Sequence, residues 1–284
     1  MTKTISFKAV TTAGLVLFFL GTIAIAQANH SWGKYHWDLS TAETEASPLK
    51  LGNNLTTAAW QASLASTSVD WNQTVLKNKV VAGTSDSACS PTLGQVEICN
   101  GAYGSTGWLG IAQVWAYRGK DAHIAQGVVQ LNDTYFNTSP YTSAAWRNMV
   151  MCQEVGHTFG LDHQDENFSN ENKGTCMDYT NDPSGLLGTN GVLNNERPNQ
   201  HDKDMMTDIY SHLNSTDGGG GGGKPGGGKK GKPSNVGAGI DLNNPSAWGE
   251  AVQQDAQGKD SVFVRNLGNG TELITHVLWA PEQE

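Results

Sequence analysis

The sequence predicts an α+β fold for most of its 284 residues. Short runs of β-branched and aromatic residues recur between positions 35 and 132, which is typical of strands. An apolar pattern with helical spacing begins at position 143. Hydrophobic residues make up 37% of the chain and charged residues 16%, a composition that supports a packed core and excludes wholesale disorder.

The first residues have the pattern of an export signal. Lys3 and Lys8 accompany a short uncharged apolar run, and residues 26–28 (Ala-Gln-Ala) form a small-x-small cleavage site. The run is shorter than the roughly 20 apolar residues that a bilayer span needs, although an uncleaved anchor is the alternative. We therefore predict a signal peptide over residues 1–28 and a secreted, extracellular mature chain.

Export also bears on the cysteines and on the charge. An even number of cysteines in a secreted chain favours disulfides. Neighbours in sequence suggest Cys89–Cys99 and Cys152–Cys176, although four cysteines allow three pairings. The net charge of −9 disfavours nucleic acid and anionic membranes as partners. We expect no nucleic acid and, after signal cleavage, no membrane.

The mature chain is expected to begin with a strand and a helix. Residues 35–39 are a short aromatic and apolar stretch that reads as a strand. Asn53 or Asn54 is expected to cap a helix, because apolar residues then recur at helical spacing as far as Trp71.

Three further strands are expected before the next helix. Residues 80–82 (Val-Val-Ala) form the first, and segments 108–117 and 124–132 form the other two. Between them, segment 83–107 contains Gly, Ser and two cysteines, and we expect a loop held by a disulfide.

The second helix is predicted to begin at Ser143 and to stop at Gly160. Segment 161–200 is rich in Asn, Asp and Gly and has little periodicity, so it is expected to be irregular. Helical spacing returns over residues 201–213, where Asp202 could lie near the cap.

A change in composition divides the chain after this helix. We assign residues 29–216 to one main domain and residues 217–238, with their Gly runs and lysines, to a flexible linker. Residues 239–284 are expected to form a small β-hairpin appendix around the Gly-Asn-Gly turn at 268–270. Two strands are not stable alone in water, so the hairpin must pack on the main domain or on a partner.

Segment 153–163 (Gln-Glu-Val-Gly-His-Thr-Phe-Gly-Leu-Asp-His) has the spacing of a metal site. On a helix, Gln153 and His157 lie one turn apart on the same face and could bind one ion. Glu154 lies about 100° around the helix, free to hold a water. Gly160 allows a sharp turn that brings His163 back as a third ligand. Three protein ligands leave the open position that a catalytic zinc requires.

This segment resembles the metzincin signature HExxHxxGxxH at every defined position except the first, where Gln153 stands in place of histidine. Residues 176–179 (Cys-Met-Asp-Tyr) resemble the Met-turn of that family. Residues 109–112 and 127–132 are similar to the matrixin edge strand and the strand after it. The resemblance covers roughly residues 30–215. It implies a metzincin-like catalytic domain with a twisted mixed sheet, an active-site helix and an irregular C-terminal subdomain that contains the Met-turn.

The resemblance implies a secreted zinc-dependent endopeptidase that acts on a protein or peptide substrate, and a monomer is expected. Gln153, His157 and His163 would bind one catalytic Zn²⁺, and Glu154 would be the general base. Tyr179 would donate a hydrogen bond to the developing oxyanion, although a packing tyrosine is an equal alternative. Met177 would be a hydrophobic floor.

Gln153 leaves three alternatives open. An amide oxygen is a weaker ligand than imidazole, but it is neutral and reaches as far from the backbone as the outer histidine nitrogen. The chain could therefore be a zinc endopeptidase, a catalytically weakened binding protein of the same fold, or a hydrolase that uses manganese, nickel or cobalt. A structural Ca²⁺ at Asp162, Asp165 and Glu166 is a further candidate, although a solvated loop is the better interpretation.

Other features complete the expectations. Residues 109–115 are the candidate edge for an extended peptide, and an ordinary buried strand is the alternative. A Cys152–Cys176 bridge would tie the ligand helix to the Met-turn. No cysteine precedes Cys89 to cap the metal, so latency would have to come from elsewhere. The remaining histidines are interpreted as ordinary polar residues: His123, His201, His212 and His276.

Overall fold

The computed structural model describes residues 30–33, 35–38, 47–119, 122–211 and 240–281. The signal peptide predicted at 1–28 and the linker predicted at 217–238 lie outside these ranges. Within them, no helix combines the length and the apolar character that crossing a bilayer requires.

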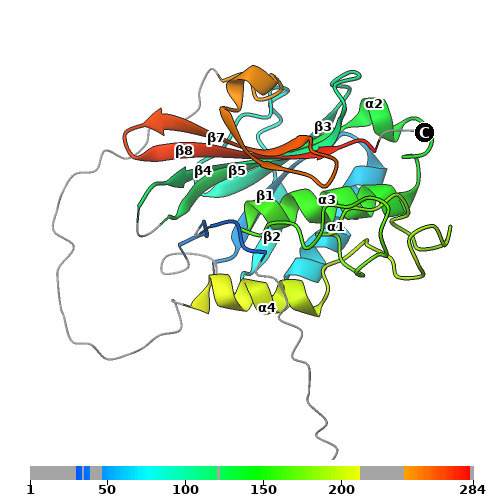
Figure 1. The fold of residues 1–284 in the computed structure, drawn as a ribbon. Helices are drawn as coiled ribbons and strands as arrows, with labels where there is room; N and C mark the ends of the chain where they lie inside the picture. Colours follow the sequence, from blue (N-terminus) through cyan, green and yellow to red (C-terminus); the bar gives the residue numbers. More distant parts are fainter. Residues whose placement is uncertain (1–29, 34, 39–46, 120–121, 212–239, 282–284) are drawn as a thin grey trace, which may run out of the picture.

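One mixed sheet of eight strands forms the centre of the molecule, in the order β2-β1-β3-β5-β4-β8-β7-β6 (Figure 1). β1, β2, β3 and β5 are parallel, whereas β4 is antiparallel to both of its neighbours, β5 and β8. The strands are β1 (Leu49–Asn54), β2 (Asn78–Ala82), β3 (Gln95–Gly101), β4 (Trp108–Tyr117), β5 (Ile124–Asn132), β6 (Glu250–Gln254), β7 (Asp260–Gly268) and β8 (Thr271–Trp279). The α+β class predicted from the sequence is confirmed.

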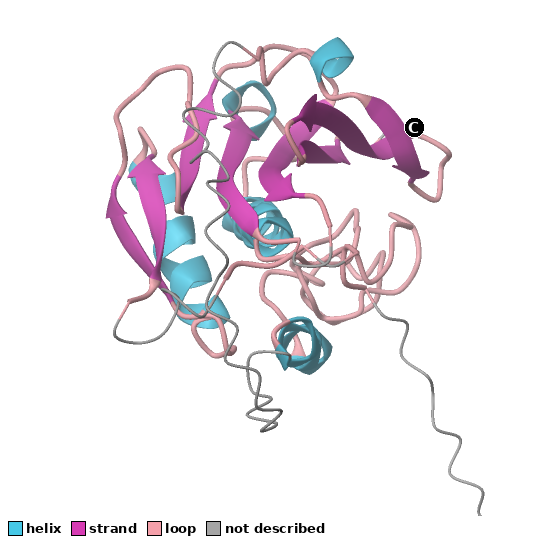
Figure 2. Ribbon diagram, turned by 90° about the vertical axis from the view of Figure 1, so that its left-hand side faces the viewer, coloured by secondary structure: helices cyan, strands magenta, loops and turns pink. Residues whose placement is uncertain are grey.

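Two long helices cover one face of this sheet. α1 (Ala58–Trp71) and α3 (Ala144–Thr158) pack on each other, and α3 also contacts β4 and β5. Figure 2 shows both helices on the same side of the strands. The short α2 (Asp133–Phe136) follows β5, and α4 (Gln200–Ile209) lies below the irregular segment.

Side-chain caps and one glycine set the ends of α3. The Ser143 side chain accepts a hydrogen bond from the backbone of Trp146 at the first turn. At the other end, Gly160 has φ +100°, and a Cβ there would meet the carbonyl oxygen of Tyr35. The sharp turn after α3 therefore requires glycine.

Three expectations for the N-terminal half were wrong. Among the described residues of 35–39, only an isolated bridge at His36 forms, and no strand. Asn53 and Asn54 belong to β1, and Thr57 caps α1 instead. The expected loop 83–107 contains β3, whose buried side chains include polar ones.

Other elements agree with the sequence. β4 and β5 have the predicted bounds, α3 begins after Ser143, and segment 161–199 contains no helix or strand. Both suggested disulfides are present, Cys89–Cys99 and Cys152–Cys176. β7 and β8 form the expected hairpin, with β6 as an additional strand beside it.

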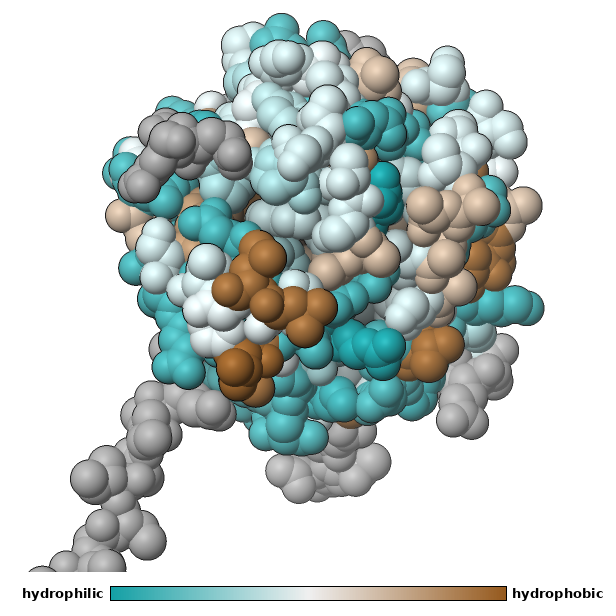
Figure 3. Space-filling view, turned by 90° about the vertical axis from the view of Figure 1, so that its right-hand side faces the viewer, coloured by the Kyte–Doolittle hydropathy of each residue, from teal (hydrophilic) through white to brown (hydrophobic). Residues whose placement is uncertain are grey.

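Apolar side chains fill both faces of the sheet. The main core lies between the sheet and α1 and α3, whereas two smaller clusters on the other face involve Leu242 and Trp248 of the C-terminal segment. Apolar side chains also reach the surface (Figure 3), and the three most exposed large ones belong to one irregular stretch: Leu186, Leu187 and Val192.

Candidate metal centre

α3 and the turn after it bring two of the three predicted ligands, His157 and His163, together in the interior. Gln153 and Glu154 are completely buried, and His157 and His163 are nearly so. The Nε2 atoms of His157 and His163 lie 2.8 Å apart. The spacing inferred from the sequence therefore does place these two imidazoles at one point.

The hydrogen bonds of the two rings define which nitrogen carries a proton. Nδ1 of His157 lies 2.9 Å from the carbonyl oxygen of Leu161, and Nδ1 of His163 lies 2.7 Å from Oε1 of Glu166. A carbonyl oxygen and an ionised carboxylate can only accept, and the pKa of Glu166 is lowered, so each Nδ1 donates. At 2.8 Å the two Nε2 atoms face each other so closely that a proton or a metal cation must lie between them.

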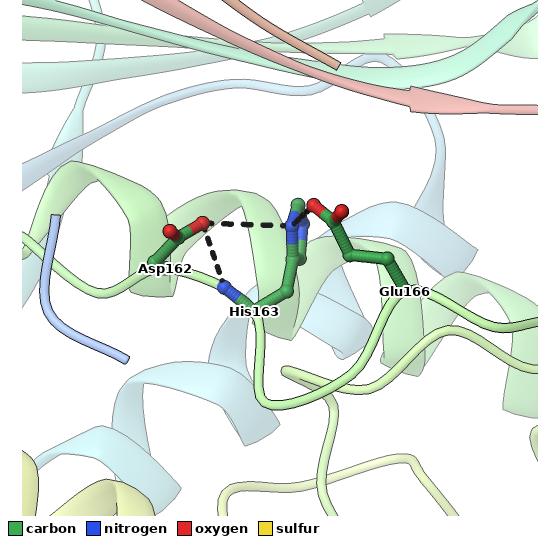
Figure 4. A group of neighbouring side chains, drawn as sticks. All are labelled: Asp162, His163 and Glu166. Atoms are coloured by element: carbon green, nitrogen blue, oxygen red, sulfur yellow. Dashed lines mark hydrogen bonds and ion pairs between the residues drawn. The ribbon is translucent and has the colours of Figure 1, made fainter. Parts of the chain in front are cut away.

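Two acidic residues, Asp162 and Glu166, lie at Nδ1 of His163. Asp162, His163 and Glu166 place ligand atoms within 4.8 Å of one another and are a candidate metal-binding group (Figure 4). Burial acts to raise the pKa of Glu166, but the hydrogen bond to His163, joined by those from Gln253 and Ser261, outweighs it and lowers that pKa. Because the contact between His163 Nδ1 and Glu166 is already a short hydrogen bond, these acids are well placed to orient the ring.

Gln153 lies on α3 one turn before His157, and its side chain is held from one side. Its Nε2 donates to the carbonyl oxygen of Cys176 at 2.8 Å. Its Oε1 is buried and has no hydrogen-bond partner among the described residues. Cys152, the residue before it, is bonded to Cys176, so the disulfide and the amide hold the same two segments together.

Glu154 faces the backbone of β4. A Cβ on Gly110 would lie 2.5 Å from Oε1 of Glu154, so only glycine leaves room for this carboxyl group. Neither oxygen of Glu154 has a hydrogen-bond partner in the described part of the chain. Burial raises the pKa of Glu154 well above its usual value.

Tyr179 lies beside the second imidazole. Its ring centroid is 4.6 Å from that of His163, and burial raises the pKa of its hydroxyl, which therefore stays a donor. The hydroxyl donates to the carbonyl oxygen of Val277 in β8, at 3.4 Å. The sulfur of Met177 packs against Gly156 of α3, where an added Cβ would lie only 2.6 Å from it.

The C-terminal hairpin changes two interpretations. Residues 109–115 are not a free edge, because β8 pairs with β4 along its length. His276 of β8, interpreted from sequence as an ordinary polar residue, stacks on His157 with ring centroids 4.2 Å apart and an interplanar angle of 10°. Its position depends on strand pairing, for which the sequence around His276 carries no signal.

Comparison with known proteins adds little to this geometry. No protein-family profile matches the chain, and no curated protein does either. A solved structure of myroilysin is similar over 62% of this chain and 82% of that chain, with 12% sequence identity and a TM-score of 0.34. A likeness at this level defines neither a shared fold nor a shared function.

Proposed function

We propose that this protein is a secreted zinc-dependent endopeptidase of the metzincin type. Its ligands would be Gln153, His157 and His163, with Glu154 as general base. The observation that carries the proposal is the 2.8 Å approach of the two Nε2 atoms while both Nδ1 atoms face acceptors. Two facing lone pairs repel each other unless a cation lies between them.

A metal ion suits the His157 side of this arrangement better than a proton does. Burial, followed by the neighbouring His276 and His163, lowers the pKa of His157 well below its usual value, so an extra proton there is unfavourable. Histidine ligands commonly donate their other N–H to a carbonyl or a carboxylate, as His157 and His163 do here. The unpartnered Oε1 of Gln153, one helical turn before His157, would supply a third neutral donor.

In peptide hydrolysis, Glu154 would transfer the proton and Tyr179 would stabilise the oxyanion. A bound zinc ion would supply Lewis acidity at the scissile carbonyl and at the attacking water. Glu154 would accept a proton from that water and deliver it to the leaving nitrogen. The Tyr179 hydroxyl, held protonated by burial, would donate to the oxygen that becomes negative.

Metal analysis combined with casein cleavage tests this proposal. We expect one zinc ion per chain, loss of binding in His157→Ala and His163→Ala, and tighter binding in Gln153→His. Chelator-sensitive cleavage should be lost in Glu154→Gln, which retains the size of the side chain. A chain that binds no zinc would overturn the proposal.

The complete burial of Glu154 favours one second candidate, a metzincin-shaped binding protein without catalysis. Under that alternative the chain holds zinc tightly, yet cleaves nothing even when the His276 side chain has been removed from the site. Casein cleavage by the variants described in the next subsection distinguishes the two.

A further inference from the structure

We propose that the C-terminal segment 240–281 is a built-in inhibitor that occupies the place of the substrate, with β8 bound to β4 as an extended peptide would be. The proposal rests on the proposed peptidase function. The inhibitor proposal explains latency, meaning a folded but inactive peptidase, by residues 240–281 and not by the residues that form the site.

The first support is the way β8 completes the sheet. β8 pairs antiparallel with β4 from Trp108 to Tyr117, the strand expected to receive an extended peptide. An incoming peptide that adds a strand needs the free backbone groups of such an edge. Because β8 uses them, a peptide can bind there only if β8 leaves.

The second support is the direction in which β8 presents its side chains. His276 pairs with Ala112 and lies on the same face as Ile274 and Leu278, which join the core between the sheet and α3. Its ring covers the ring of His157, and its Nδ1 is buried without a hydrogen-bond partner among the described residues. The side chain therefore fills space directly at the candidate metal centre.

The third support is the backbone contact at Val277. The Tyr179 hydroxyl, proposed to stabilise the oxyanion of a substrate, donates to the carbonyl oxygen of Val277. A carbonyl of the chain itself thus has the partner that the scissile carbonyl of a substrate would have.

The neighbouring strands contact the acids behind His163. Gln253 of β6 donates to Oε1 of Glu166 at 3.0 Å, and Ser261 of β7 reaches the same oxygen at 3.5 Å. All three C-terminal strands therefore touch either the candidate site or the groups that orient it. In this arrangement Glu154 and Tyr179 have no accessible surface, and no protein substrate can reach them in this conformation.

A disulfide lock between β4 and β8 tests the proposal in the full chain. Gln113 and Thr275 are paired across the two strands, and Gln113 Nε2 donates to Thr275 Oγ1 at 3.1 Å. Strand alternation places this pair on the face away from His276, so the lock does not alter the site itself. The variant is Gln113→Cys/Thr275→Cys, and the two single cysteine variants are its controls.

Three rates are measured on these proteins: zinc extraction by a chromogenic chelator, casein cleavage, and deuterium uptake by the amides of residues 109–115. We expect extraction and uptake to be about tenfold or more slower in the locked chain than in either single variant, because opening of β8 is blocked. Cleavage should be lost in the locked chain.

A second experiment removes the His276 side chain while β8 stays paired with β4, and it includes a control variant. His276→Ala is expected to speed zinc extraction and to increase casein cleavage. His123→Ala is the matched control, since this histidine contacts His36 and Asp38, away from the site, and it should change neither rate.

The outcomes separate the two proposals. Equal extraction, cleavage and uptake in the locked and single variants would overturn the inhibitor proposal, because the site would then work with β8 in place. Absence of zinc in every variant would overturn the proposed function instead. Deuterium uptake, which needs no metal, would still decide whether β8 opens.

Discussion

The Cys152–Cys176 disulfide offers a prediction with a matched control in the same chain. Replacing both cysteines by alanine removes the covalent tie between α3 and the segment after Lys173. The closed loop spans 24 residues, and loop-closure entropy then predicts a loss of about 3.4 kcal/mol in the free energy of unfolding. The Cys89–Cys99 bridge spans 10 residues, for which the same relation predicts about 2.7 kcal/mol.

The two double variants should differ in metal affinity far more than in stability. All four cysteines are buried, so the packing losses are similar. Only Cys152 and Cys176 hold Gln153, through the peptide bond on one side and the hydrogen bond to the Cys176 carbonyl on the other. Zinc affinity should therefore fall about 10- to 100-fold in Cys152→Ala/Cys176→Ala, which is the usual effect of losing a group that holds a metal ligand in place. It should stay unchanged in Cys89→Ala/Cys99→Ala.

Urea unfolding measures the stability of each variant, and competition with a chelator in the absence of urea measures the zinc affinity of the folded protein. A stability loss near 3 kcal/mol leaves most small domains folded, so both measurements are accessible. Equal zinc affinities for the two double variants would refute the reasoning, because Gln153 would then not depend on the bridge.

Three further predictions concern single residues. Gly110→Ala should destabilise the protein by about 1–3 kcal/mol in urea unfolding, because its Cβ would overlap Glu154; an unchanged midpoint would contradict this packing. Gly160→Ala should cost at least about 1–2 kcal/mol in the same assay, since its positive φ is strained for alanine, and a smaller loss would mean that the turn relaxes. Burial raises the pKa of Asp178 from 3.8 to about 6, so its contribution to stability is full below pH 3.8 and is lost as the pH rises through 6, by at most about 3 kcal/mol. Asp178→Asn should flatten this decline in unfolding measured against pH, and a persisting slope would exclude Asp178 as its source.

The sequence was sufficient for elements with a strong local signal. α3 has a serine cap, apolar residues at helical spacing and a glycine that must turn, and each of these is a property of neighbouring residues. β4 and β5 are long runs that are buried on both faces, so their bounds follow from their apolar content. The approach of His157 to His163 followed from the same local spacing.

Elements whose side chains are satisfied by distant partners were missed. In β3, Glu97 is completely buried and accepts a hydrogen bond from the distant Asn54 of β1, besides those from the nearby Thr92 and Gln95, so an acidic residue lies in a strand that its own pattern does not predict. β1 has only two leucines to mark it, and its glycine lies against Glu97. For such strands the pairing partner supplies the stabilisation, and the pattern of a single strand cannot reveal it.

His276 is a second residue whose position could not be predicted from the sequence, and its burial indicates what β8 does. Within β8, period-2 alternation places Ile274, His276 and Leu278 on the face that packs toward α3, where the two flanking side chains are apolar and fully buried. Burying an imidazole between them is costly unless it has a partner, and a strand whose only task is to close the sheet would be more stable with an apolar residue there. The histidine stands at the one position of β8 that meets His157. The cost of burying this imidazole is explained if β8 acts on the site. We therefore expect His276→Ala to leave the fold intact and to change the rate of zinc extraction.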